Sequence, residues 1–282
     1  MDLSPSLNSL PGTGAQGRCA RPRRPAGQAL LTTALAAGLA VLWAFGLAGC
    51  AQMGAASTSS APTGQAEPAP ELMPLAAVAP GVLQDMRYHG AHNFMGRPIA
   101  GYEAAQCWLS RPAAQALAAV QREVQPLGLT LKVFDCYRPQ RAVDDFVRWG
   151  KDLQDQKNKA EYYPRVPKQE LFQRGYIAER SGHSRASTVD LTLLVRDGLL
   201  ARQVLAGPLA DGQEVDMGTP FDLFDELSHT ANDSLAPDVQ RNRQWLRALM
   251  QRHGWRNLPE EWWHYTLEHE PYPQRYFDIP VR

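Results

Sequence analysis

The sequence of 282 residues has no excess of charge, because 29 Lys and Arg stand against 29 Asp and Glu. Proteins that bind nucleic acid are usually strongly basic, so this balance argues against a nucleic-acid partner. Internal repeats and glycine-rich nucleotide motifs are also missing from the sequence. The composition therefore favours one ordinary packed domain whose function has to be read from its motifs.

Cysteine is scarce as well, with four residues in the whole chain. Cys19 and Cys50 fall in the N-terminal region, which leaves Cys107 and Cys136 for the folded domain. In an oxidising compartment these two could form one disulfide, and two buried free thiols are the alternative. Metal binding by this pair is not expected.

One long hydrophobic run is present, from Ala29 to Leu47. Arginines precede it, and it ends in Leu47-Ala48-Gly49-Cys50, which resembles the lipobox of bacterial lipoproteins. We therefore expect residues 1–50 to be a signal peptide with Cys50 as the lipidated residue. An uncleaved membrane helix is the alternative, since the run is just long enough to span a bilayer.

The expected lipid anchor implies a periplasmic protein held on a membrane. Ala51 follows the cysteine in place of the aspartate that is associated with retention in the inner membrane, so an outer-membrane anchor is favoured. Residues 51–80 are rich in Ala, Ser, Pro, Gly and Thr, which predicts a flexible tether. Residues 81–282 are enough for one packed core.

Periodicity and composition predict an irregular order of helices and strands in this domain. The expected helices cover residues 112–127, a segment opening at Pro139, and residues 239–253. The expected strands cover residues 129–134, 188–195 and 261–267. This order predicts an α+β fold with a central antiparallel sheet flanked by helices.

Three residues in the second half of the chain have the chemistry of a catalytic zinc site. Such sites commonly take three His or carboxylate ligands and leave a position open for water, and His183, Asp190 and His264 supply this set. The spacing alone is loose, so ordinary structural roles for these residues remain an alternative. Glu261 lies three residues before His264 and is a candidate base. On a straight strand the two would point to opposite faces, so this role requires a bend between them.

Residues 181–193, Ser-Gly-His-Ser-Arg-Ala-Ser-Thr-Val-Asp-Leu-Thr-Leu, resemble the zinc-ligand segment of the D-alanyl-D-alanine dipeptidases. This family includes the vancomycin-resistance dipeptidases. Further segments match the family in the same order along residues 82–282. They are Tyr88 with Asn93-Phe94, residues 134–143, residues 217–222, and residues 261–265 followed by 270–273.

The resemblance implies one zinc ion per chain, bound by His183, Asp190 and His264, with Glu261 as general base. It also implies that Arg138 stabilises the oxyanion, a role that suits a planar, always charged guanidinium. Without the resemblance, Arg138 would be read as a surface residue beside a helix start.

The charged ends of the substrate would be held by Asp222, Asp135, Ser181 and Tyr88, with Asp222 as the partner of the ammonium. The implied activity is zinc-dependent hydrolysis of D-alanyl-D-alanine. One alternative is a D,D-carboxypeptidase or endopeptidase that acts on peptidoglycan peptides. Another is a non-catalytic, metal-containing peptide-binding protein, although such a protein has no need for a base and an oxyanion donor.

Overall fold

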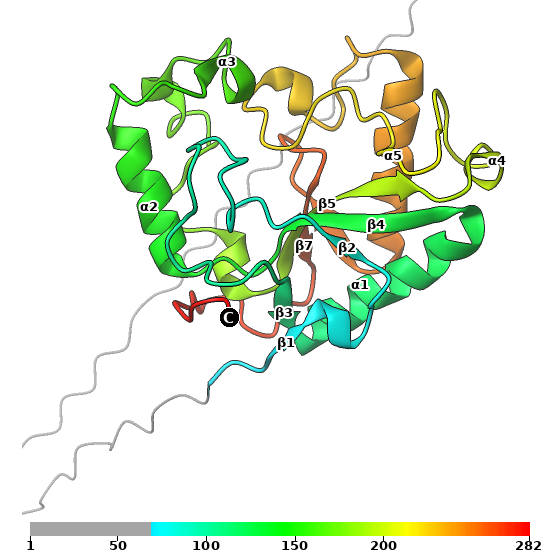
Figure 1. Ribbon diagram of the computed structural model, residues 1–282, viewed down its shortest axis with the longest axis horizontal. Helices are drawn as coiled ribbons and strands as arrows, with labels where there is room; N and C mark the ends of the chain where they lie inside the picture. The colour runs from blue at the N-terminus through cyan, green and yellow to red at the C-terminus, as the bar shows by residue number, and fades with distance from the viewer. Residues whose placement is uncertain (1–68) are drawn as a thin grey trace, which may run out of the picture. The chain divides into compact units, whose positions relative to one another are not determined.

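The structure is a computed structural model that describes residues 69–282 (Figure 1). Five strands form the main sheet in the order β2-β4-β5-β7-β6, and β1 pairs with β3 in a separate two-stranded sheet. The strands are β1 (Leu72–Pro74), β2 (Leu83–Gln84), β3 (Trp108–Ser110), β4 (Leu129–Asp135), β5 (Thr188–Val195), β6 (Trp255–Asn257) and β7 (His264–Leu267).

Helices flank the main sheet. The α-helices are α1 (Arg111–Val124), α2 (Gln140–Lys151), α3 (Lys159–Tyr162), α4 (Gly198–Ala201) and α5 (Pro237–Arg252). Short 3-10 turns are η1 (Leu75–Ala77), η2 (Gln125–Leu127), η3 (Lys168–Glu170), η4 (Gly182–Arg185) and η5 (Glu226–Ser228). In Figure 1, α2 lies on the left of the molecule and α1 and α5 on the right.

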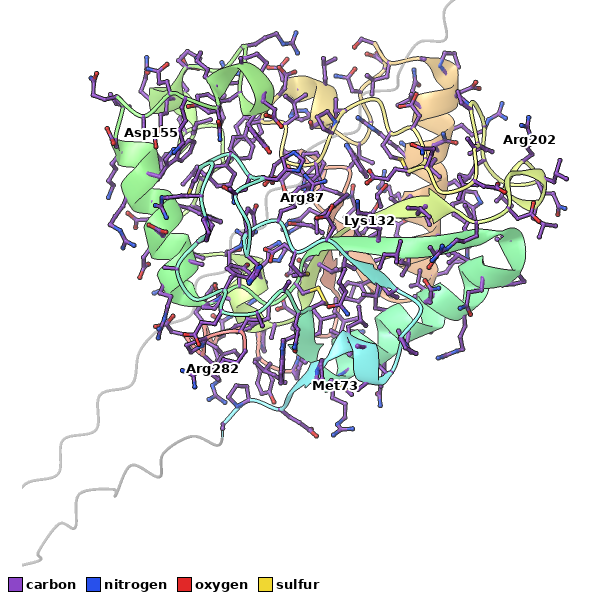
Figure 2. The ribbon with its side chains drawn as sticks, viewed as in Figure 1. Met73, Arg87, Lys132, Asp155, Arg202 and Arg282 are labelled. Carbon is purple, nitrogen blue, oxygen red and sulfur yellow. A yellow bond between two sulfur atoms is a disulfide. The ribbon has the colours of Figure 1, made fainter. Side chains whose placement is uncertain are left out.

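The fold class agrees with the expectation, since every pair in the main sheet is antiparallel except β2 with β4. All eight residues of β5 are buried, so this central strand is covered on both faces. Side chains fill the space on either side of the ribbon (Figure 2). Burial on both faces explains why most residues of β5 are apolar, although Thr188, Asp190 and Thr192 are polar.

The ends of α1 follow from its sequence. Pro112 stands in the first turn, where its missing N–H costs nothing, and η2 extends the helix to Gly128. Gly128 has φ +71°, and a Cβ there would lie 2.5 Å from the carbonyl oxygen of Asp197. Only glycine fits this reversal, which turns the chain directly into β4.

The boundary expected at residue 81 is too late. Leu72–Pro74 pairs with β3, and Leu75 is completely buried. This pairing joins residues more than thirty positions apart, so local composition gave no sign of it. The signal peptide, Cys50 and most of the expected tether lie outside the described residues. Within residues 69–282, no helix is both long and apolar enough to cross a membrane.

A disulfide joins Cys107 to Cys136, so the bonded alternative is the one found in the structure. It ties the segment before β3 to the residue that follows β4, and both cysteines are fully buried. The two residues are 29 positions apart. Closing a loop of this size stabilises a fold by about 3–4 kcal/mol in the chain-entropy model.

We expect the double variant Cys107→Ala/Cys136→Ala to lose about 3 kcal/mol of unfolding free energy, because its unfolded chain is less constrained. Urea unfolding with and without the reductant TCEP measures this loss. The reductant should lower the midpoint of the wild type and leave that of the double variant unchanged. A wild-type midpoint that ignores the reductant would contradict the prediction.

Candidate metal centre

Strand pairing brings two of the three expected ligands together. Asp190 on β5 is directly opposite His264, the first residue of β7, so both side chains leave the same face of the sheet. His183 comes from η4, just before β5. The Ser181 hydroxyl caps this turn by accepting a hydrogen bond from the His183 N–H at 3.3 Å. Ala186, with φ +61°, then reverses the chain into β5.

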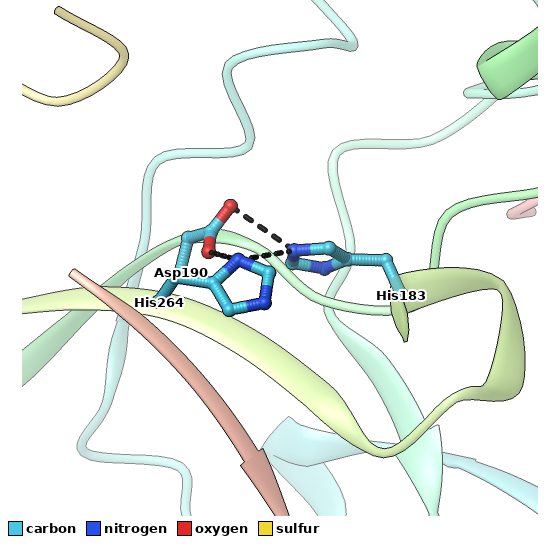
Figure 3. A group of neighbouring side chains, drawn as sticks. All are labelled: His183, Asp190 and His264. Atoms are coloured by element: carbon cyan, nitrogen blue, oxygen red, sulfur yellow. Dashed lines mark hydrogen bonds and ion pairs between the residues drawn. The ribbon is translucent and has the colours of Figure 1, made fainter. Parts of the chain in front are cut away.

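The three side chains converge on one point (Figure 3). His183 Nε2 lies 3.3 Å from Asp190 Oδ2 and 3.4 Å from His264 Nδ1, and His264 Nδ1 lies 3.1 Å from Asp190 Oδ1. Ligand atoms of a tetrahedral zinc ion, with bonds of about 2.0–2.1 Å, are about 3.3–3.4 Å apart. The two imidazole nitrogens are therefore spaced like two ligands of one zinc ion, and the Asp190 carboxylate lies at a similar distance from each of them through one of its two oxygens.

The protonation of these groups also suits a cation. His183 Nδ1 lies 2.7 Å from the Cys136 carbonyl oxygen; donating its proton there leaves Nε2 free to face the centre. Asp190 Oδ1 is buried, and its close partner is the His264 ring nitrogen of the same centre. Burial raises the pKa of Asp190, but the imidazoles of His183 and His264 lower it by more than burial raises it. The net pKa is below the usual value, so the carboxylate is charged. These donors fit a divalent cation.

His264 is the ligand most affected by its neighbours. Burial lowers its pKa, but the carboxylates of Asp190 and Glu261 raise it, to about 10 on balance. In the metal-free protein the ring is therefore a charged imidazolium at neutral pH, with a proton on both nitrogens. A bound cation has to displace that proton, since metals bind neutral imidazole.

Glu261 reaches the centre through the bend that its expected role requires. The backbone turns at Trp262 and Trp263, where the His264 N–H donates to the Glu261 carbonyl at 3.2 Å. Glu261 Oε2 then lies 3.4 Å from His264 Nδ1. Asn257 holds this turn, because its side-chain amide donates to the backbone oxygens of Glu261 and His264, both at 3.0 Å.

Arg138 lies beside the metal centre, and the buried carboxylate of Asp135 holds its guanidinium in place. Its Nε and a terminal nitrogen bind one oxygen of Asp135 at 2.9 and 2.7 Å, and the Tyr102 hydroxyl donates to the other at 2.6 Å. Asp135 is fully buried and does not line the cavity, so its expected contact with substrate is wrong. Both of its oxygens are used in holding Arg138 and Tyr102. No motif or spacing pointed to Tyr102 as part of the site.

Asp222 and Tyr88 form the second polar group of the site. The Tyr88 hydroxyl donates to Asp222 Oδ2 at 2.8 Å, and Asp222 adopts a left-handed conformation with φ +63°. Burial, together with the nearby Asp190 carboxylate, raises the pKa of Asp222 well above its usual value. A cation near this carboxylate would therefore be strongly favoured.

These groups surround a cavity of about 290 Å³. Its volume is at the lower end of the range for small-molecule sites, which suits a small ligand. Ser181 lies on its wall, as expected. The polar and charged residues that line it include Tyr88, Arg138, Arg180, Ser181, His183, Arg185, Asp190, Asp222, Glu261 and His264.

The model of one peptidase family, described as D-Ala-D-Ala dipeptidase, matches residues 68–282. The chain belongs to this family. A D-alanyl-D-alanine dipeptidase of Streptomyces coelicolor is 40% identical over 201 residues, which are 71% of this chain and 93% of the relative. The D-alanyl-D-alanine dipeptidase of Enterococcus faecalis is 39% identical over 201 residues, which are again 71% of this chain and 93% of the relative. That of Escherichia coli is 32% identical over 200 residues, 70% of this chain and 84% of the relative.

In this dipeptidase-family chain, Arg243 supports the site from a position that the sequence did not indicate. It is 1% exposed and donates to the carbonyls of Met217, Leu227 and His229 at 2.7–2.8 Å. It also binds the Thr219 hydroxyl, which accepts from Trp262 Nε1 at 2.9 Å. Arg243 thus links the segment that carries Asp222 to the turn that carries Glu261. An arginine on a polar helix would ordinarily be read as exposed.

We expect zinc to bind the metal-free protein about tenfold more tightly for each pH unit between pH 6 and 8, because binding displaces one proton from His264. Calorimetric titration at several pH values measures this slope. The variant His264→Ala should lose tight binding, whereas His269→Ala, an exposed histidine five residues later, should keep it. An affinity that does not change with pH would contradict the assignment.

Proposed function

We propose that the protein hydrolyses D-alanyl-D-alanine to two D-alanines, using one zinc ion and Glu261 as the base. The arrangement of His183, Asp190 and His264 at zinc spacing, with Glu261 beside them in a small cavity, is the observation that carries the proposal. The names of the relatives supply the substrate. Dipeptide hydrolysis is also what membership of the family supports.

His183, Asp190 and His264 would hold the zinc ion. When bound, zinc polarises a carbonyl group and lowers the pKa of water, which makes attack on a peptide bond feasible at neutral pH. Glu261 accepts a proton from the attacking water and donates it to the leaving amine. Its carboxylate is fixed by the turn at Trp262 and Trp263 and is 15% exposed, so it meets substrate in the cavity.

Arg138 stabilises the negative charge that develops on the carbonyl oxygen. Its contacts with Asp135 use Nε and one terminal nitrogen, while the other nitrogen has only a long 3.5 Å contact with Ser181. That nitrogen is therefore available to the substrate. The rings of Tyr88 and Phe146, with centroids 5.1 and 4.9 Å from the guanidinium carbon, keep the group in place.

Asp222 binds the substrate ammonium and thereby limits substrate length. A peptide with a blocked amine offers no cation to this buried group, whose pKa is raised well above its usual value, so it forms no ion pair with Asp222 and binds less tightly than a free amine. The site then favours free dipeptides over the longer stem peptides that a D,D-carboxypeptidase would cleave. Tyr88 supports this selection by orienting Asp222.

The N-terminal region places the enzyme in the periplasm through a lipid on Cys50. Support comes from the arginine-rich start, the apolar run and Leu47-Ala48-Gly49-Cys50. Labelling of cells with a palmitate analogue tests this part. Cys50→Ser should lose the label, whereas Cys19→Ser should retain it. A labelled Cys50→Ser protein would contradict the anchor.

The catalytic proposal is tested by D-alanine release from D-Ala-D-Ala by the zinc-loaded protein. Glu261→Gln removes the base, so kcat should fall by a factor of about 10²–10⁴. The matched control Glu260→Gln changes the neighbouring exposed carboxylate and should keep kcat within about twofold of the wild type.

N-acetyl-D-Ala-D-Ala should be cleaved poorly by the same preparation, because it has no ammonium for Asp222. Cleavage of the acetylated substrate in preference to the free dipeptide would assign the protein to the carboxypeptidases. An unchanged kcat in Glu261→Gln would contradict the role of the base. No cleavage of either substrate would favour a binding protein.

A further inference from the structure

Three arginines line the cavity, and two of them are committed to carboxylates of the protein. Arg138 binds Asp135, and Arg185 forms two hydrogen bonds of 2.7 Å with Glu270. Arg180 has no hydrogen bond or ion pair with any residue among positions 69–282. Its guanidinium carbon lies 5.1 Å from the centroid of the Tyr276 ring.

The balance of charge in the cavity leaves one requirement of a dipeptide unmet. Asp190, Glu261 and Asp222 attract cations, namely the metal and the substrate ammonium. A dipeptide also brings a carboxylate, which these acidic groups would repel. The imidazoles of His183 and His264 are turned to the metal centre, and the available nitrogen of Arg138 is assigned to the carbonyl oxygen, so Arg180 is the remaining lining cation for the carboxylate.

The position of Arg180 on the cavity wall fits recognition of a substrate carboxylate. It immediately precedes Ser181, and it borders both the cavity and an open groove that Arg148 and Glu179 also line. Two residues of chain span at most about 7 Å, so a dipeptide that reaches Asp222 has its other end within the same cavity.

The chemistry of the side chain also suits this role. A guanidinium presents two parallel N–H groups to a carboxylate, and stacking on an aromatic ring restricts its conformations before the ligand arrives. Less side-chain entropy is then lost on binding. The ring of Tyr276 provides this surface, and it is fixed in turn by Arg185, which donates to the Tyr276 hydroxyl at 3.4 Å.

We propose that Arg180 binds the C-terminal carboxylate of the substrate and so determines specificity for dipeptides with a free carboxyl group. Asp222 and Arg180 then recognise the two charged ends, and the metal centre acts on the bond between them. This inference rests on the proposed dipeptidase function.

The test compares the wild type with Arg180→Gln, and uses Arg148→Gln as a matched control from the neighbouring groove. We expect Arg180→Gln to raise KM for D-Ala-D-Ala roughly tenfold and to change kcat less than about threefold. The lost interaction stabilises the bound substrate and the transition state equally, so the barrier between them does not change. Arg148→Gln should behave as the wild type. D-Ala-D-Ala amide, used as a competitive inhibitor, should have the same Ki with the wild type and with Arg180→Gln.

An unchanged KM in Arg180→Gln would overturn the inference. Parallel increases in KM for the dipeptide and in Ki for the amide would also overturn it, because they would show a structural effect that does not depend on the carboxylate. If the wild type releases no D-alanine at all, the proposed function fails instead. Calorimetric binding of the dipeptide and its amide to the zinc-loaded protein and to Arg180→Gln then decides the role of Arg180 by the same comparison.

Discussion

The register of three neighbouring strands is the constraint on which the site depends. Asp135 at the end of β4 pairs with Asp190 on β5, and Asp190 pairs with His264 on β7, so the three form one row across the sheet. Because side chains alternate between faces, a slip of one residue would carry Asp190 to the opposite face and remove a ligand. The complete burial of β5 fixes this register, since a slipped strand would also misplace its apolar side chains. The metal centre is thus specified by the same packing that holds the domain together.

Buried charge is the second theme of the structure, and Asp135 and Arg243 both have defined partners. Asp135 is held by Tyr102 and Arg138, and Arg243 is surrounded by backbone carbonyls. Removing one member of such a pair leaves a stranded charge and typically costs about 3–5 kcal/mol. Asp222 differs, because its one side-chain hydrogen bond comes from the neutral Tyr88 hydroxyl, and burial and the Asp190 carboxylate raise its pKa well above the usual value. A cation from outside the protein would stabilise the charged form of this carboxylate, which supports its proposed role in binding the substrate ammonium.

Many elements of the fold and residues of the site could be predicted from the sequence. The features that could not be predicted share a physical cause. Residues 188–195 form β5 with the bounds that their β-rich composition predicts, and Gly128 ends the first helical segment as its conformational freedom predicts. The bend before His264 followed from the alternation of side chains on a strand. The packing of Leu72–Pro74 and the roles of Tyr102 and Arg243 could not be predicted, because each depends on a partner far away in the sequence. Burial of Asp135 was missed for the same reason.

The central claim is that His183, Asp190 and His264 hold a catalytic zinc ion beside Glu261. It is tested most directly by crystals of the zinc-loaded protein measured at X-ray energies above and below the zinc absorption edge. We predict one strong anomalous peak bounded by His183 Nε2, the Asp190 carboxylate and His264 Nδ1, which disappears below the edge. A peak at another position, or no peak at these residues in zinc-loaded crystals, would contradict the account.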